Sequence, residues 1–97
     1  MSLYFTLWDT GRAIEPFLPP GCPTWGGNAD IPMTTLHPFP SGKVEVKMKV
    51  VGFDAADGES LAAAEIHARR QMMGLIYHLQ TRGYQGTVLD RHVLASV

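Results

Sequence analysis

The clearest pattern along the chain is a strict alternation of charged and apolar side chains that begins at Lys43. Odd positions are charged and even positions are apolar up to Val50, and the alternation breaks at Val51 and Gly52. A period of two residues is typical of a β-strand with one buried face and one wet face. The pattern therefore predicts a strand over about residues 43–53, with a bulge or bend near its end.

Three shorter segments carry weaker strand patterns. Residues 3–8 alternate, with apolar side chains at every second position and aromatic residues among them. Residues 33–37 form a short candidate strand, which the loop 38–42 can join to the strand 43–53 as a hairpin. Residues 87–94 are rich in residues that favour strands, and they predict the last strand of the sheet, with an interruption near Asp90–Arg91.

Residues 60–82 show the period of an α-helix. One apolar stripe recurs at steps of three and four residues and consists of Leu61, Ala64, Ala68, Met72, Leu75 and Leu79. At 100° per residue, a second apolar row lies beside this stripe, and together they span roughly 220°. The second row consists of Ala62, Ile66, Met73 and Tyr77. One face of a sheet cannot cover so wide an arc, so we expect a loop or a second chain to cover the second row.

The rest of the helix surface is polar, and we expect it to face water. Its residues are His67, Arg70, Gln71, Gly74, His78 and Arg82. Asp57 or Ser60 is a suitable N-cap for this helix, because a short polar side chain can accept bonds from free backbone amides. Gly83 follows the last turn and predicts a C-terminal stop, since glycine readily adopts the left-handed conformation.

The segment 10–42 differs in composition from the rest of the chain. It contains all seven prolines and five of the ten glycines. Proline fixes φ and lacks a backbone donor, so this segment cannot form one regular element. We therefore predict one α+β domain over residues 1–97, in which a small mixed or antiparallel sheet of three to four strands is packed by one long helix. The predicted order is β-(β)-β-α-β, with a Pro/Gly-rich loop region at 10–42 and a strand-helix-strand core at 43–97.

The composition of the chain limits which binding partners and which cellular compartment we expect. The net charge of −1 gives the whole chain no attraction for polyanions, which argues against nucleic acid as a partner. Cys22 is the single cysteine, so an internal disulfide is impossible and we expect a reduced, cytoplasmic protein. No stretch approaches the roughly 20 apolar residues of a membrane span, so we expect no membrane partner.

The sequence contains no recognisable catalytic or metal-binding motif. Cys22 is followed directly by a proline, so no helix begins there to lower the pKa of the thiol. His67 and His78 lie eleven residues apart, about 16 Å along a helix, and cannot bind the same metal ion. We therefore predict no catalytic residue, no metal site and no cofactor, and a binding protein rather than an enzyme.

The long loop is the best functional indicator in the sequence. A connection of about 30 residues exceeds the usual limit of roughly 12–15 residues in a compact domain. It either lies on the core or forms one wall of a pocket or docking surface. In the second case we expect Trp25 to be the anchor and Asp30 or His37 to be the polar contact.

Three hypotheses about function remain open. The first is a non-catalytic binding or interaction module, which binds a protein or associates with itself as a dimer through the second row of the helix. The second is a small-molecule-binding protein or enzyme with a pocket under the loop 10–42. The third is weak nucleic-acid binding through the strand face that carries Lys43, Lys47 and Lys49.

Overall fold

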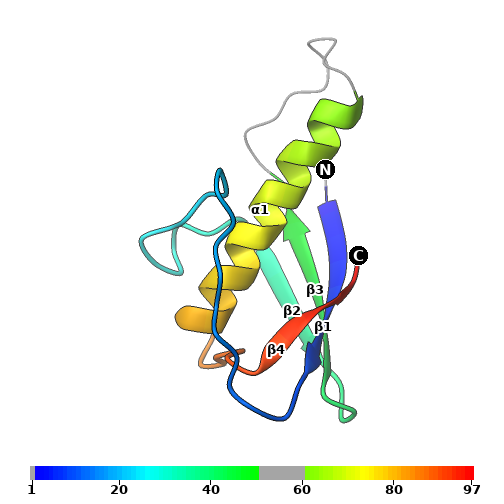
Figure 1. The fold of residues 1–97 in the computed structure, drawn as a ribbon, viewed down its shortest axis with the longest axis vertical. Helices are drawn as coiled ribbons and strands as arrows, with labels where there is room; N and C mark the ends of the chain where they lie inside the picture. Colours follow the sequence, from blue (N-terminus) through cyan, green and yellow to red (C-terminus); the bar gives the residue numbers. More distant parts are fainter. Residues whose placement is uncertain (1, 51–60) are drawn as a thin grey trace.

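The computed structural model describes residues 2–50 and 61–97, with side chains from residue 63 onward in the second range. It is an α+β fold of one four-stranded sheet and one long helix, as the sequence predicts (Figure 1). The elements are β1 (Ser2–Asp9), β2 (Thr34–Pro38), β3 (Lys43–Lys49), α1 (Leu61–Thr81) and β4 (His92–Ser96). No helix in the described part of the chain is both long and apolar enough to cross a membrane.

The sheet has the order β2-β3-β1-β4, and every neighbouring pair is antiparallel. β1 and β2 therefore run in the same direction with β3 between them, and β3 and β4 run in the same direction with β1 between them. The segment 10–33 joins the first pair, and α1 lies in the connection between the second pair; both are on the same side of the sheet. The connectivity is that of two split βαβ units. In the first unit the irregular segment 10–33 stands where a helix would be.

The core lies between the helix and the inner face of the sheet. In the two central strands, β1 and β3, the inward side chains alternate with exposed ones, as their sequence pattern predicts. The buried cluster consists of Phe5, Leu7, Val44, Val46 and Met48 from the sheet, Met72, Leu75, Ile76 and Leu79 from α1, and Leu89 from the turn that follows it.

Most element boundaries agree with the sequence pattern. β2 and β3 form the expected hairpin, which is closed by the bond from the Phe39 amide to the Lys43 carbonyl at 2.8 Å. Gly83 ends the helix with a φ of 77°, and its amide donates to the His78 carbonyl at 3.1 Å. The expected bend at Val51–Gly52 and the N-caps Asp57 and Ser60 lie outside the described residues.

The last strand is interrupted by a turn at Asp90–Arg91, as predicted, but the prediction of a strand before this turn is wrong. Thr87 forms only an isolated bridge with Tyr84, residues 88–89 are irregular, and β4 begins at His92. The cause is Leu89, which is buried in the core and whose amide donates to the Leu79 carbonyl of α1 at 2.9 Å. The carbonyls of Asp90 and Arg91 then accept bonds from the beginning of the segment 10–33. This turn therefore holds one end of the long segment.

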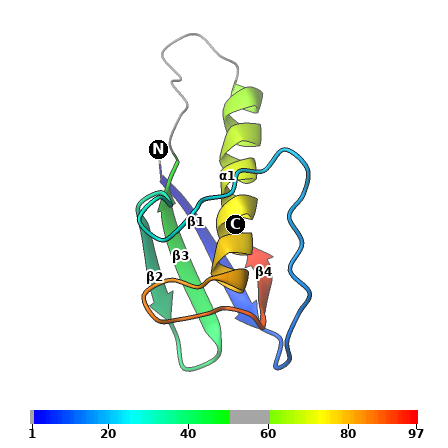
Figure 2. The same ribbon diagram turned by 90° about the vertical axis from the view of Figure 1, so that its left-hand side faces the viewer.

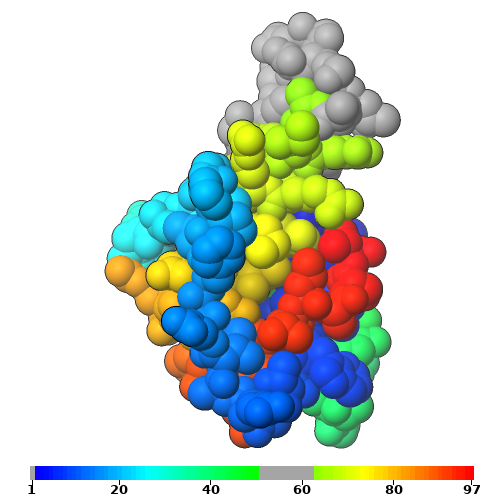
Figure 3. Space-filling model, in the orientation of Figure 1, coloured from blue at the N-terminus to red at the C-terminus, as the bar shows by residue number. Residues whose placement is uncertain are grey.

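The segment 10–33 lies on the side of α1 that faces away from the sheet. Figure 2 shows the helix between the sheet and the first part of this segment, and Figure 3 shows its atoms against those of the helix. The prediction that the polar side of the helix faces water is therefore wrong for part of that side, whereas Arg70 and Arg82 are exposed as predicted. Gln71, Gly74 and His78 are buried, because the segment packs against the side where they lie.

The segment and the helix approach each other closely at Gly74. A β-carbon at this position would collide with the carbonyl oxygen of Pro23 and would lie 3.2 Å from the ring carbon Cγ of the same proline. Any larger residue here would have to push the segment away. The absence of a side chain at position 74 thus sets the distance between the helix and its outer cover.

This contact predicts that Gly74→Ala destabilises the protein. In an uncovered helix the same change would stabilise by about 1 kcal/mol, because alanine is the better helix former. Here we expect a loss of about 1–3 kcal/mol in the free energy of unfolding, because the added methyl group overpacks the contact with Pro23. Urea unfolding followed by circular dichroism measures this difference.

The matched control is Gly27→Ala, because a β-carbon there meets no atom within 4 Å. We expect this change to be close to neutral. A more stable Gly74→Ala protein would show that the segment 10–33 does not pack on α1.

Candidate functional site

The sequence-predicted site residues do not come together in one place. Trp25 is half-buried and packs against the core, and it lines a groove beside α1. Asp30 is exposed in a turn, where its amide donates to the Gly27 carbonyl at 3.0 Å. His37 is exposed in β2 at the position paired with Glu45, on the sheet face that points away from the helix. A pocket that joins Trp25 to His37 therefore does not exist, because the sheet lies between them.

The second apolar row of the helix is covered to different degrees. Met73 packs against the core, and Tyr77 is half-buried in the groove beside Trp25. Ile66 keeps 52 % of its surface exposed, whereas the side chain of Ala62 lies outside the described residues. The row is therefore not a continuous exposed stripe.

The groove beside α1 has a volume of about 350 Å³ and lies where the segment 10–33 meets the last turns of the helix. His78 lies at its base with 4 % of its surface exposed, and its Nε2–H donates to Oδ1 of Asn28 at 2.8 Å. The Arg82 guanidinium donates to the Gly26 carbonyl on the same segment. These two polar contacts hold the segment on the helix, so the groove is part of the fold's internal packing.

Burial is the main reason that the pKa of His78 lies below its ordinary value, and the charge of Arg82 lowers the same pKa further. The imidazole is therefore neutral in the folded protein at pH 7. This state fits the bond to Asn28, because a neutral ring with its proton on Nε2 donates to an amide oxygen.

The outer face of the sheet, which points away from α1, is not covered by any described element. Tyr4 and Trp8 of β1 point outward and keep 62 % and 46 % of their surfaces exposed. Their cross-strand partners in β3 are Lys47 and Lys43 respectively. A strand that alternates inward apolar and outward polar residues must present all its outward side chains together, so this grouping follows directly from the register.

Lysines and aromatic rings are in contact on this face. Nζ of Lys47 lies 5.6 Å from the centroid of the Tyr4 ring, and Nζ of Lys43 lies 4.9 Å from that of Phe39. Such cation–π contacts place positive charge beside exposed rings. Glu45 forms a salt bridge of 3.5 Å with Lys43, whereas no carboxylate is paired with Lys47 or Lys49 among the described residues.

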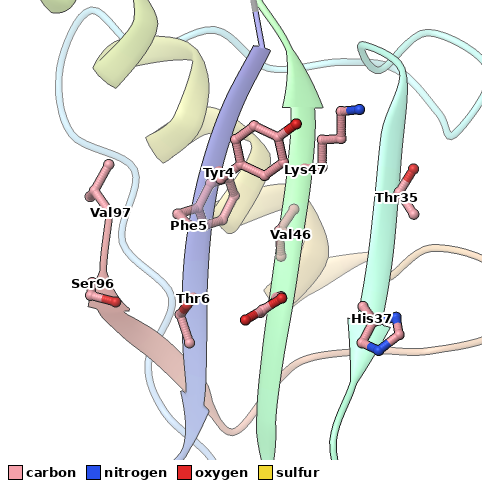
Figure 4. Close-up of a pocket in the computed structure, with 10 residues that line it drawn as sticks. Tyr4, Phe5, Thr6, Thr35, His37, Val46, Lys47, Ser96 and Val97 are labelled. Carbon is pink, nitrogen blue, oxygen red and sulfur yellow. The ribbon is translucent and has the colours of Figure 1, made fainter.

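A shallow hollow of about 490 Å³ lies on the same face (Figure 4). Tyr4 and Thr6 line it from β1, Lys47 from β3, and Thr35 and His37 from β2. Ser96 and Val97 close it at the end of β4. The hollow therefore offers hydroxyl groups, an imidazole and an ammonium group beside one aromatic ring. The sequence pattern indicated the lysines and His37 as candidates, but not the two aromatic residues of β1.

Comparisons of the chain with protein families, with curated proteins and with solved structures find no match. Within the described residues, no group of three or more His, Cys, Asp or Glu side chains could hold a metal ion.

The burial of neutral His78 predicts that the protein loses stability on acidification. The pKa is about 6.5 in the unfolded chain and lower in the fold, so the unfolded state binds the proton first. The free energy of unfolding should be constant above about pH 6.5 with respect to this group, and should fall as the pH drops from there towards the pKa of the folded state. Urea unfolding at pH 7.5 and pH 5.5 measures the difference.

His78→Gln is the control, because it removes the titrating group while keeping a polar side chain. We expect a smaller loss between the two pH values in this variant than in the unchanged protein. Asn28→Asp should also reduce the loss, since a carboxylate beside the imidazole favours its charged form. An identical loss in all three proteins would contradict the assignment to His78.

Proposed function

We propose that this protein is a non-catalytic binding module, and that the outer face of its sheet binds a negatively charged macromolecular partner. The observation that carries this proposal is the set of exposed aromatic rings beside lysines on the two central strands. A surface patch that combines exposed rings with one sign of charge is typical of an interaction site.

Protection of a sheet edge does not account for the lysines. Lysines often lie on edge strands, where they prevent pairing with another sheet. β3, however, lies between β2 and β1 and has no free edge along Lys43–Lys49. Three lysines on the wet face of a central strand therefore support a role in binding.

The charge of this face differs from that of the whole chain. The three lysines of β3 contribute +3 and Glu45 contributes −1, so the strand's outer side chains carry +2. The whole chain has a net charge of −1, so all other residues together carry −3. Like charges would meet if two copies packed sheet to sheet, because a twofold interface brings the same patch of each copy together. The charge therefore favours an anionic partner over self-association through this face.

The helix row offers weaker support for the hypothesis of a dimer. Met73 and Tyr77 are partly buried within the chain itself, which leaves Ile66 as the strongly exposed apolar residue of the row among the described side chains. A single exposed apolar residue is ordinary on a protein surface. We therefore place the interaction on the sheet and not on the helix.

Binding to a heparin column tests the charge of the proposed surface. We expect the unchanged protein to be retained at about 50 mM salt, and we expect Lys47→Gln/Lys49→Gln to elute at clearly lower salt, because anion binding depends on these ammonium groups. Both proteins should show the same circular dichroism spectrum, since the two side chains are exposed.

Arg69→Gln/Arg70→Gln is the matched control, because it removes two charges from the helix and none from the sheet. This variant should elute with the unchanged protein. The proposal fails if the protein is not retained, or if the helix variant and the strand variant lose the same retention.

A further inference from the structure

We propose that the partner of the outer sheet face is a single-stranded nucleic acid, whose bases stack on Tyr4 and Trp8 while its phosphates contact the lysines of β3. This inference rests on the proposed function and names the chemistry of the ligand. It adds that bases stack on the exposed rings, whereas the proposed function requires only that the surface bind a negatively charged partner.

The rings and lysines form a repeating arrangement across two strands. Tyr4 is paired with Lys47, and Trp8 is paired with Lys43. Four residues separate the two rings along β1, which corresponds to about 13 Å at the rise of an antiparallel strand. Each ring therefore has a lysine opposite it on the neighbouring strand. Nζ of Lys47 lies beside the Tyr4 ring, so one nucleotide can place its base on Tyr4 and its phosphate near Lys47. Nζ of Lys43 lies over Phe39 and forms the salt bridge with Glu45.

The exposure of the rings is the observation that points to stacking. Tyr4 keeps 62 % of its surface exposed and Trp8 keeps 46 %. Aromatic side chains usually bury most of their area, because their transfer from water is favourable. Bases stack on such rings without strict sequence preference, since every base has a flat π-face.

Polar groups in the hollow beside Tyr4 suit the edges of bases. Thr6 and Thr35 contribute hydroxyl groups to the hollow, and His37 contributes an imidazole (Figure 4). Glu45 lines the same hollow and is acceptor-only when ionised. Carboxylates accept hydrogen bonds from the amino group of cytosine, so an acidic residue among the lysines is compatible with this ligand.

A single strand fits this surface better than a duplex or an acidic protein. The bases of a duplex are stacked on each other, so they have no free faces to offer to the rings. An acidic peptide would pair with Lys47 and Lys49 but would leave the rings of Tyr4 and Trp8 without a stacking partner. The combination of rings and charge therefore favours unpaired bases on a phosphate backbone.

Fluorescence anisotropy of a labelled 12-residue oligothymidylate tests the inference on the unchanged protein. We expect binding to weaken with salt, with a slope of about −2 in log K against log salt, because three lysines contribute about −0.7 each with single strands. A duplex of the same length should bind more weakly than the single strand. Polyphosphate and polyglutamate of matched charge serve as competitors and should displace the oligonucleotide poorly.

Substitutions at Tyr4 separate stacking from charge. Tyr4→Leu removes the ring but keeps an apolar side chain, and we expect it to weaken oligonucleotide binding by about 5- to 150-fold. Tyr4→Phe keeps the ring and should bind like the unchanged protein. Neither variant should change retention on heparin, because neither alters a charge.

Phe17→Leu is the matched control, since Phe17 is also an exposed ring but lies in the segment 10–33 that covers the helix. It should leave oligonucleotide binding unchanged. Trp8→Leu gives an independent second test of stacking, and circular dichroism of each variant shows that it is folded.

The outcomes separate this inference from the proposed function. Retention on heparin without oligonucleotide binding would overturn the nucleic-acid inference and leave the anion-binding surface intact. Tighter binding of polyglutamate than of oligothymidylate would identify an acidic protein partner, and equal affinities of Tyr4→Leu and the unchanged protein would show that stacking plays no part. Either of these results also overturns the inference. Loss of both heparin and oligonucleotide binding would overturn the inference and the proposed function together.

Discussion

The packing of the segment 10–33 on α1 is the interaction on which the rest of the structure depends. The buried part of this helix is wider than one sheet face can cover, and it includes polar residues such as Gln71 and His78. The sheet covers one side, and an irregular segment without helix or strand covers the other. The contact requires glycine at position 74, since any side chain there would meet the Pro23 carbonyl. Polar bonds from His78 to Asn28 and from Arg82 to Gly26 complete it.

This arrangement determines which surface of the sheet stays open. Both long connections, the segment 10–33 and α1, lie on the same side of the sheet (Figures 1 and 2). No described element is left to cover the opposite side, so the outward residues of β1 and β3 meet solvent. The exposed rings of Tyr4 and Trp8 are a consequence of this one-sided coverage. The topology of the fold therefore determines which face of the sheet is exposed, and the residues on that face determine what it can bind.

Much of the fold is predictable from the sequence because its signals are local. The alternation that begins at Lys43 predicts the strand and also which of its faces is buried. The apolar residues at helical spacing predict the helix, and Gly83 predicts where it ends. The last strand was less predictable. Leu89 belongs to a β-rich run, yet its amide donates to the Leu79 carbonyl of the helix and its side chain is buried in the core, so it lies in an irregular segment and not in the strand. A contact with a distant element overrode the local preference there.

The sequence by itself determined the element types, the inward faces of the central strands and the position of the lysines on a wet face. These properties depend on periods of two and 3.6 residues, which are set by backbone geometry alone. Only the tertiary structure decided that part of the polar side of the helix is buried, that Trp25 and His37 lie on opposite sides of the sheet, and that Tyr4 and Trp8 pair with lysines. Those facts depend on strand order, register and the path of a proline-rich segment. Such long-range pairings carry no local periodic signal, because each residue's partner lies tens of residues away in the chain.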